Sequence, residues 1–231
     1  GDERPVTVDS DVHRPGVNAA AVDPGVAAIG RIDALVNNAG RGLVGAVEET
    51  SDAEARAVFD VNVFVLLAVT RAVLPEMRAQ GSGLVINVSS VGGFVAWPGW
   101  GVYCATKFAV EGLSDAMKHE LEPLGIKVTA IEPGPFRTDF LDGSSLHIAA
   151  TEIADYASTG GAARTWAVDN NAGQAGDPEK AAAIIVGLAS EDRLPERIQL
   201  GANAVHDIAD KLARTSRDLE QWREVALSAD F

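Results

Sequence analysis

Short apolar runs alternate along the chain with longer stretches in which apolar side chains recur every three or four residues. The runs Ile32–Val36, Leu84–Val88 and Lys127–Ile131 predict buried strands, and Arg197–Leu200 predicts a shorter last strand. Buried strands that alternate with helices are typical of a parallel sheet covered on both faces. The pattern therefore predicts an α/β fold built as a single domain.

Helical patterns fill the intervals between these strands. Ser51 and Glu54 form a capping-box pattern at the start of a long helical stretch. The predicted helices cover Ser51–Gln80, Val102–Leu124, the residues from Asp177-Pro178-Glu179 onwards, and most of Asn203–Ala226. The polar, glycine-rich stretch Leu141–Gly176 is predicted to be irregular, and a loop of that length is typical of an active-site lid.

Three segments follow the carboxyl ends of predicted strands: Asn37–Gly40, Ser89–Gly93 and Pro133–Thr138. In open α/β sheets, ligands bind beyond these ends. Because parallel strands end at the same edge of a sheet, we expect the three segments to share one rim and to form a ligand site there.

Tyr103 and Lys107 are four residues apart on one predicted helix, so their side chains share a face. A cation beside a phenol lowers the phenol pKa from its reference of about 10, which predicts a tyrosine able to exchange protons. A chance pair on a solvated face is the alternative. Ser90 ends a strand thirteen residues before Tyr103, where its hydroxyl either binds a substrate oxygen or stabilises a turn.

Asn62 falls on the apolar stripe of its predicted helix, beside Val58, Phe59 and Leu66. A buried amide without hydrogen bonds costs about 1–3 kcal/mol, so Asn62 is expected to bind a backbone carbonyl or an ordered water. A structural role and a catalytic role both remain open for this side chain.

The run SSVGGFVAWPGWGVYCATKFAVEGL resembles the active-site segment of the short-chain dehydrogenases/reductases, which has a serine, a tyrosine thirteen residues later and a lysine four after that. LVNNAG, the asparagine in FDVNVF, and EPGPFRTDF are similar to further motifs of the family, in the family's order. The amino-acid sequence of this segment is most similar to that of the steroid and retinol dehydrogenase branch and its bacterial relatives. The resemblance implies a Rossmann-like, doubly wound parallel sheet over residues 1–231, with residues 141–176 as a substrate lid.

The resemblance implies an NAD(P)-dependent oxidoreductase that transfers a hydride between the nicotinamide cofactor and a ketone or secondary alcohol. Tyr103 would be the general acid/base, and Ser90 would orient and polarise the substrate oxygen. Lys107 would lower the pKa of Tyr103 and bind the nicotinamide ribose, and Asn62 would hold a water in a proton relay. The implied cofactor contacts are Asp11, Val12, Asn37, Ala39, Gly40, Tyr103, Lys107, Pro133, Gly134, Phe136 and Thr138, with Asn37 also fixing the sheet.

The family's glycine-rich TGxxxGIG loop has no counterpart in the chain. In the family this loop receives the pyrophosphate at a helix N-terminus, so we expect two strand–helix units to precede Asp11 in the natural protein. The alternative is a non-catalytic binding or scaffold protein on the same fold, unable to bind dinucleotide. The stretch Gly40–Gly45 fits G-x-G-x-x-G, but the helix signal comes only at Ser51, which predicts a decoy.

The expected partner is a small apolar or cyclic carbonyl compound or alcohol. The aromatic residues Trp97, Trp100, Tyr156 and Trp166 either line its pocket or serve ordinary packing. The resemblance also implies a homodimer or homotetramer joined through Ser51–Gln80 and Val102–Leu124. The resemblance implies NADP or NAD as the cofactor. The choice between the two is open, because the residues that decide it in the family are not in the chain.

The amino-acid composition excludes several other classes of protein. The 231 residues are 47% hydrophobic and include one cysteine, which excludes a disordered chain and a disulfide scaffold. The net charge of −14 would repel nucleic acid, and the four histidines lack metal-ligand spacing. The first residues lack a signal-peptide pattern, and no apolar stretch reaches the ~20 residues of a membrane span, so a cytoplasmic protein without membrane contacts is expected.

Overall fold

The computed structural model describes residues 30–230. Its main sheet has four parallel strands in the order β1-β3-β4-β6. These strands are β1 (Ala34–Asn37), β3 (Gly83–Val88), β4 (Ile126–Pro133) and β6 (Arg197–Leu200). The strands predicted from the sequence are therefore confirmed, with small shifts at their ends. The expected cofactor contacts Asp11 and Val12 lie outside the described residues.

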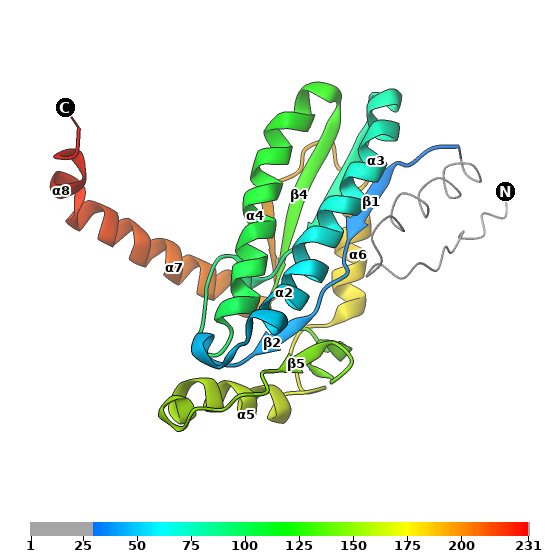
Figure 1. The fold of residues 1–231 in the computed structure, drawn as a ribbon. Coiled ribbons are helices and arrows are strands. Elements are labelled where there is room, and N and C mark those ends of the chain that lie inside the picture. Colours follow the sequence, from blue (N-terminus) through cyan, green and yellow to red (C-terminus); the bar gives the residue numbers. More distant parts are fainter. Residues whose placement is uncertain (1–29, 231) are drawn as a thin grey trace.

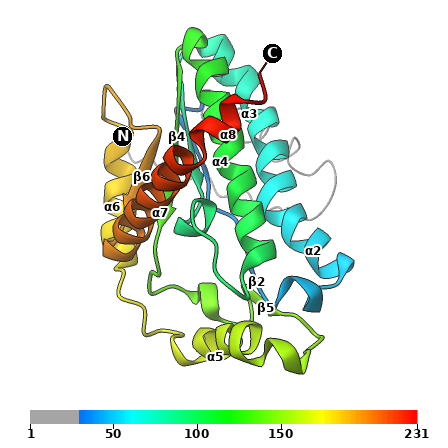
Figure 2. The ribbon, with the colours of Figure 1, turned by 90° about the vertical axis from the view of Figure 1, so that its left-hand side faces the viewer.

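Helices cover both faces of this sheet (Figure 2). One face carries α2 (Asp52–Phe59), α3 (Leu66–Gln80) and α4 (Gly101–Leu121), and the other carries α6 (Pro178–Leu188). Beyond β6, α7 (Ala202–Gln221) continues into α8 (Arg223–Leu227), and both project away from the sheet (Figure 1). The expected parallel sheet with helices on both faces is thus confirmed.

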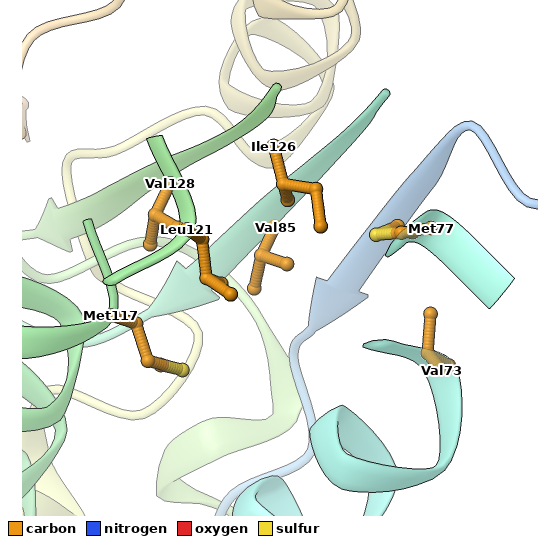
Figure 3. Close-up of a cluster of buried hydrophobic side chains, with 7 residues drawn as sticks. All are labelled: Val73, Met77, Val85, Met117, Leu121, Ile126 and Val128. Atoms are coloured by element: carbon orange, nitrogen blue, oxygen red, sulfur yellow. The ribbon is translucent and has the colours of Figure 1, made fainter. Parts of the chain in front are cut away.

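The side chains of β3 alternate between two apolar cores. Val85 points into the core beneath α3 and α4, which also contains Val73, Met77, Met117, Leu121, Ile126 and Val128 (Figure 3). Leu84 and Ile86 point into the opposite core, where Leu188 of α6 meets them. Because both faces of β3 are buried, its sequence shows a continuous apolar run rather than a polar–apolar alternation.

The long helical segment that begins at α2 has a capped start and an irregular middle. Ser51 Oγ accepts a hydrogen bond from Glu54 N at 3.3 Å, and Glu54 Oε2 accepts one from Ser51 N at 2.8 Å, so the predicted capping box is confirmed. Between α2 and α3 the backbone forms a π-helix over Asp60–Val65, which includes Asn62. Single π-helical turns of this kind are frequent at functional sites.

By length and composition alone, the combined helix Asp52–Gln80 could cross a membrane, since its most apolar window has a mean hydropathy of 2.0. In the structure this helix packs on the sheet, with Val73 and Met77 in the apolar core and the polar Asn62 and Thr70 buried. The expectation that no apolar stretch is long enough for a membrane span is therefore wrong by length and composition. Packing in the core accounts for part of the apolar character of this helix, since 39% of its most apolar window is buried.

The prediction that Leu141–Gly176 is irregular is wrong. This segment contains β5 (Leu146–Ile148), a 3₁₀ turn (Ala154–Tyr156), a π-helix (Ala157–Gly161) and α5 (Ala162–Asp169). β5 pairs in parallel with β2 (Gly42–Val44), and the two strands share an apolar cluster with α5. Each strand has only three residues and its partner is about a hundred residues away, so no local pattern marked either of them.

The strand β2 also settles the role of the G-x-G-x-x-G stretch at Gly40–Gly45. Its residues pair with β5 and do not open a helix. A pyrophosphate loop of this type leads directly into a helix N-terminus. The prediction that this stretch is a decoy is confirmed.

Candidate active site

The carboxyl ends of β1, β3 and β4 open into a cavity of about 820 Å³. Each of the three segments predicted to share this rim contributes to its wall. The lining residues from these segments are Asn38, Gly40, Ser89, Ser90, Val91, Pro133, Gly134, Pro135, Phe136 and Thr138. The expectation that the three segments share one rim is therefore confirmed, and this rim borders the cavity.

Tyr103, Lys107 and Ser90 all line this cavity. Tyr103 and Lys107 project from the first two turns of α4, with only 7% and 5% of their surfaces exposed. A Cβ placed on Gly92 would lie 3.3 Å from both Ser90 Oγ and the Tyr103 ring. The glycine at this position thus allows the serine hydroxyl and the phenol to approach each other.

Lys107 is held by the sheet. Its Nζ donates a hydrogen bond to the carbonyl oxygen of Val88 at 2.9 Å. Burial lowers the pKa of the Lys107 ammonium to about 8, and the nearby carboxylate of Glu111 partly opposes this change. The side chain therefore loses its charge in a pH range where an ordinary lysine stays fully protonated.

The phenol of Tyr103 differs from the expectation. Burial raises the pKa of Tyr103 above its ordinary value, and the Ser90 hydroxyl lowers it by a smaller amount. The expectation of a net lowered pKa for Tyr103 is therefore wrong for this structure, because loss of solvation outweighs any lowering by the neighbouring Lys107 charge. The phenol is protonated at neutral pH, which suits a proton donor.

Asn62 has all its principal hydrogen bonds within the protein. Its Oδ1 accepts from Arg41 N at 2.8 Å, and its Nδ2 donates to Arg41 O at 3.0 Å and to Thr106 Oγ1 at 2.9 Å. The sequence-based alternative of a bond to a backbone carbonyl is confirmed. A Cβ on Gly40 would lie 3.4 Å from Asn62 Oδ1 and 3.6 Å from Lys107 Nζ, so both side chains border this turn.

Replacing Asn62 by alanine should leave the backbone groups of Arg41 and the Thr106 hydroxyl without these partners. We expect Asn62→Ala to lower the free energy of unfolding by about 1–3 kcal/mol in urea titrations. The exposed Asn171 provides a matched control, and Asn171→Ala should change stability by less than about 0.5 kcal/mol. Equal stabilities of the two variants would contradict a bracing role for Asn62.

Asn37 fixes the sheet, as expected, but does not line the cavity. Its Nδ2 donates to Thr70 Oγ1 at 3.0 Å and to Asn87 Oδ1 at 2.8 Å, and Asn87 Nδ2 donates to Ser114 Oγ at 2.9 Å. This chain of buried amides and hydroxyls joins β1 and β3 to α3 and α4. The cavity wall at β1 is formed by Asn38 and Gly40, while Ala39 does not contribute to it.

Aromatic side chains form part of the cavity wall. Trp97, Trp100 and Trp166 line it, as one sequence-based alternative predicted. The Trp100 ring lies edge-on to Tyr103 and Trp166, with ring centroids 5.8 Å and 6.3 Å apart. Tyr156 does not line the cavity, because its hydroxyl donates to Glu48 Oε2 at 2.6 Å.

Buried and half-buried carboxylates fasten the segment 141–176 to the rest of the domain. Glu49 Oε2 accepts from Arg164 Nη2 at 2.7 Å, and Glu49 Oε1 accepts from Ile153 N at 2.9 Å. The hydrogen bond from Arg164 holds the pKa of Glu49 down to about 2, so this carboxylate stays ionised at neutral pH. Glu54 Oε1 also bonds His147 Nε2 at 2.9 Å.

Two residues at or near the site were not predicted from the sequence. Gln174 lines the cavity with a buried side chain, and nothing in its glycine-rich segment marked it. Glu111 is buried one turn after Lys107 and accepts a hydrogen bond from Arg197 Nε at 2.9 Å. Its spacing of four residues from Lys107 was a signal that could have identified it. Within residues 30–230, no group of three His, Cys, Asp or Glu side chains could hold a metal ion.

Comparison with known proteins adds evidence of ancestry. Residues 2–148 match the family described as short chain dehydrogenase. Oxidoreductase BOA17 of Botryotinia fuckeliana is 36% identical over 230 residues, which cover 99% of this chain and 83% of that protein. The crystal structure of a short-chain dehydrogenase from Streptomyces avermitilis is 40% identical, with a TM-score of 0.88 over 96% of this chain and 80% of that chain.

Two further solved structures match a smaller part of the chain. A gluconate 5-dehydrogenase from Burkholderia cenocepacia in complex with NADP and tartrate is 34% identical, with a TM-score of 0.56 and coverage of 58% of this chain. Carveol dehydrogenase from Mycobacterium avium in complex with NAD is 35% identical, with a TM-score of 0.59 and coverage of 61%. The chain spans 52% and 51% of these two proteins.

Proposed function

Because this chain belongs to the short-chain dehydrogenase family, a family of oxidoreductases, we propose that it interconverts a ketone and a secondary alcohol with a nicotinamide cofactor. The observation that carries this proposal is the convergence of Ser90, Tyr103 and Lys107 on one cavity at the carboxyl edge of the sheet. The alternative of a non-catalytic scaffold gives no reason for a buried lysine beside a buried phenol.

The lining residues fit a nicotinamide cofactor. Lys107 supplies a cation, Thr138 a hydroxyl, and the segment Pro133–Gly134 brings backbone close to the cavity. The two solved relatives in complex with NADP and with NAD support this cofactor class. When bound, the cofactor supplies the hydride for reduction and accepts it for oxidation.

Tyr103 is the proposed general acid for reduction. Its phenol is protonated at neutral pH because burial raises its pKa, so it can donate a proton to the carbonyl oxygen of the substrate. The Ser90 hydroxyl donates a hydrogen bond to the same oxygen and polarises the carbonyl. The positive charge of Lys107 favours the phenolate that remains on Tyr103 after the transfer.

The segment 141–176 is the proposed lid over the substrate. Ala163 and Trp166 of α5 line the same cavity as Tyr103, and the ion pair between Glu49 and Arg164 anchors this helix. The largely apolar wall, which includes Trp97, Trp100 and Trp166, favours an apolar or cyclic substrate. We also propose that the protein self-associates through the segment α2–α3 and through α4. Phe64 and Phe108 on these segments are 57% and 45% exposed, and exposed apolar side chains are typical of such interfaces.

Fluorescence titration with NADH and NADPH tests the cofactor, and the loss of absorbance of the reduced cofactor tests turnover with cyclic ketones such as tetralone. We expect at least one cofactor to bind with a Kd in the micromolar range and to be oxidised when ketone is added. Comparison of the two titrations measures the choice between NAD and NADP. Failure of both cofactors to bind would favour the scaffold alternative.

A further inference from the structure

Gln174 is a buried amide without a partner. It is 5% exposed, and neither its Oε1 nor its Nε2 has a hydrogen bond within the described part of the chain. The residue lines the cavity that also holds Tyr103. Buried side-chain amides are nearly always hydrogen-bonded, so a polar group that is left unpaired at a cavity wall points to a ligand.

The backbone around Gln174 is fixed rather than loose. Arg137 Nε donates to the carbonyl oxygen of Gln174 at 3.3 Å, and Arg137 N donates to the carbonyl oxygen of Gly176 at 2.9 Å. Gly176 N donates in turn to Pro135 O at 3.0 Å, and the Phe136 ring packs on Gly176. These contacts attach the residue to the segment after β4, so the amide has a defined position in the wall.

The surroundings of this amide decide what kind of group it can bind. The lid side of the cavity is dominated by apolar side chains, among them Trp97, Phe140, Leu141 and Trp166. The charged side chains of the cavity wall are Lys107, at the reacting end, and Asp207 of α7. An amide can both donate and accept a hydrogen bond, which suits an uncharged hydroxyl or carbonyl group. Asp207 and the net charge of −14 disfavour a carboxylate.

We propose that Gln174 is a specificity-determining residue that hydrogen-bonds a second, uncharged polar group of the substrate, distinct from the carbonyl at Tyr103. The substrate class is then a bulky apolar carbonyl compound or alcohol that carries a further hydroxyl or carbonyl group. This inference rests on the proposed oxidoreductase function. A site that holds a buried amide discriminates strongly against ligands that leave this amide unpaired.

The test compares matched ketones that differ only in their remote group. Hydroxytetralone and methyltetralone form one pair, and para-hydroxybenzylacetone and para-methylbenzylacetone form another. For the wild-type protein we expect kcat/KM to favour the hydroxyl compound by at least about tenfold in one pair. In Gln174→Leu that ratio should fall to within about twofold of unity, while kcat for the methyl compound stays within about threefold of wild type.

Controls separate this inference from a folding defect and from the proposed function. Ser158 is an exposed polar residue of the same cavity wall, and Ser158→Ala should keep the wild-type ratio. Gln174→Met, which keeps the length of the side chain, should behave as Gln174→Leu does, and melting temperatures report whether each variant is folded.

Three results would overturn the role of Gln174. They are a ratio near unity in the wild type for both pairs, an unchanged ratio in both Gln174 variants, or a rise in cofactor KM in place of a change in ratio. The last result would assign the amide to the cofactor. Absence of turnover with every ketone, in wild type and variants alike, would instead refute the proposed function and this inference with it.

Discussion

Tyr103→Phe should reduce kcat by about 10²–10⁴-fold and leave cofactor binding nearly unchanged. The substitution removes the only proton that the proposed mechanism delivers to the substrate oxygen, while the ring keeps its contacts with Trp100 and Phe140. Turnover is measured from the absorbance of the reduced cofactor, and binding from its fluorescence. Melting temperatures of wild type and variant should agree within a few degrees, since within residues 30–230 the Tyr103 hydroxyl has no hydrogen bond to a backbone group that its loss would expose.

The second tyrosine of the chain is a matched control. Tyr156 lies outside the cavity wall, and its hydroxyl is bound to Glu48. Tyr156→Phe removes the same atom from the lid segment and should keep kcat within about twofold of wild type. Full activity of Tyr103→Phe, or an equal loss in both variants, would refute the assignment of Tyr103 as proton donor.

The main sheet and the site at its edge could be predicted because their signals are local or follow from sheet geometry. The apolar run in β3 is continuous because both faces of this strand are buried between helices. Ser51 and Glu54 marked the start of α2 because a capping box is complete within four residues. The rim followed from the rule that parallel strands end at the same edge.

The features that escaped prediction depend on contacts between distant parts of the chain. The pairing of Gly42–Val44 with Leu146–Ile148 leaves no trace in either sequence, because strands of three residues show no periodicity. Burial of Gln174 depends on the attachment of its backbone to the segment after β4. Neither contact can be inferred without the fold.

The predicted direction of the Tyr103 pKa shift differs from that in the structure for a related reason. Sequence spacing places Lys107 on the same face of α4, which suggests a lowered pKa for the phenol. The structure adds two facts that the spacing does not contain: Tyr103 is 7% exposed, and Lys107 donates to Val88 O. Loss of solvation then outweighs the effect of a neighbouring charge.

Lys107 makes the pH dependence of the reaction testable. Its ammonium has a pKa of about 8 and is charged below that pH, so its stabilisation of the Tyr103 phenolate is present below pH 8 and is lost above it. We expect kcat to fall on the alkaline side with a midpoint near pH 8. Lys107→Met should lose about 10²–10³-fold of kcat and show no such limb. An alkaline midpoint that stayed near pH 8 in Lys107→Met would assign the titration to another group.

A substitution at Glu111 gives a second test that the alkaline limb belongs to Lys107, because the Glu111 carboxylate raises the pKa of Lys107. Removing that charge in Glu111→Gln should move the alkaline midpoint to lower pH. The charged and titratable groups that face Glu111 are Lys107 and Asp115 on α4, Glu132 on β4, whose pKa burial raises to about 7, and Arg197 on β6. Asp115 shares Arg197 with Glu111, whereas Glu111 is the carboxylate that raises the pKa of Lys107, so Asp115→Asn is the matched control and should leave the midpoint in place. Equal displacement in both variants would show that Arg197, and not the charge of Glu111 on Lys107, sets the alkaline limb.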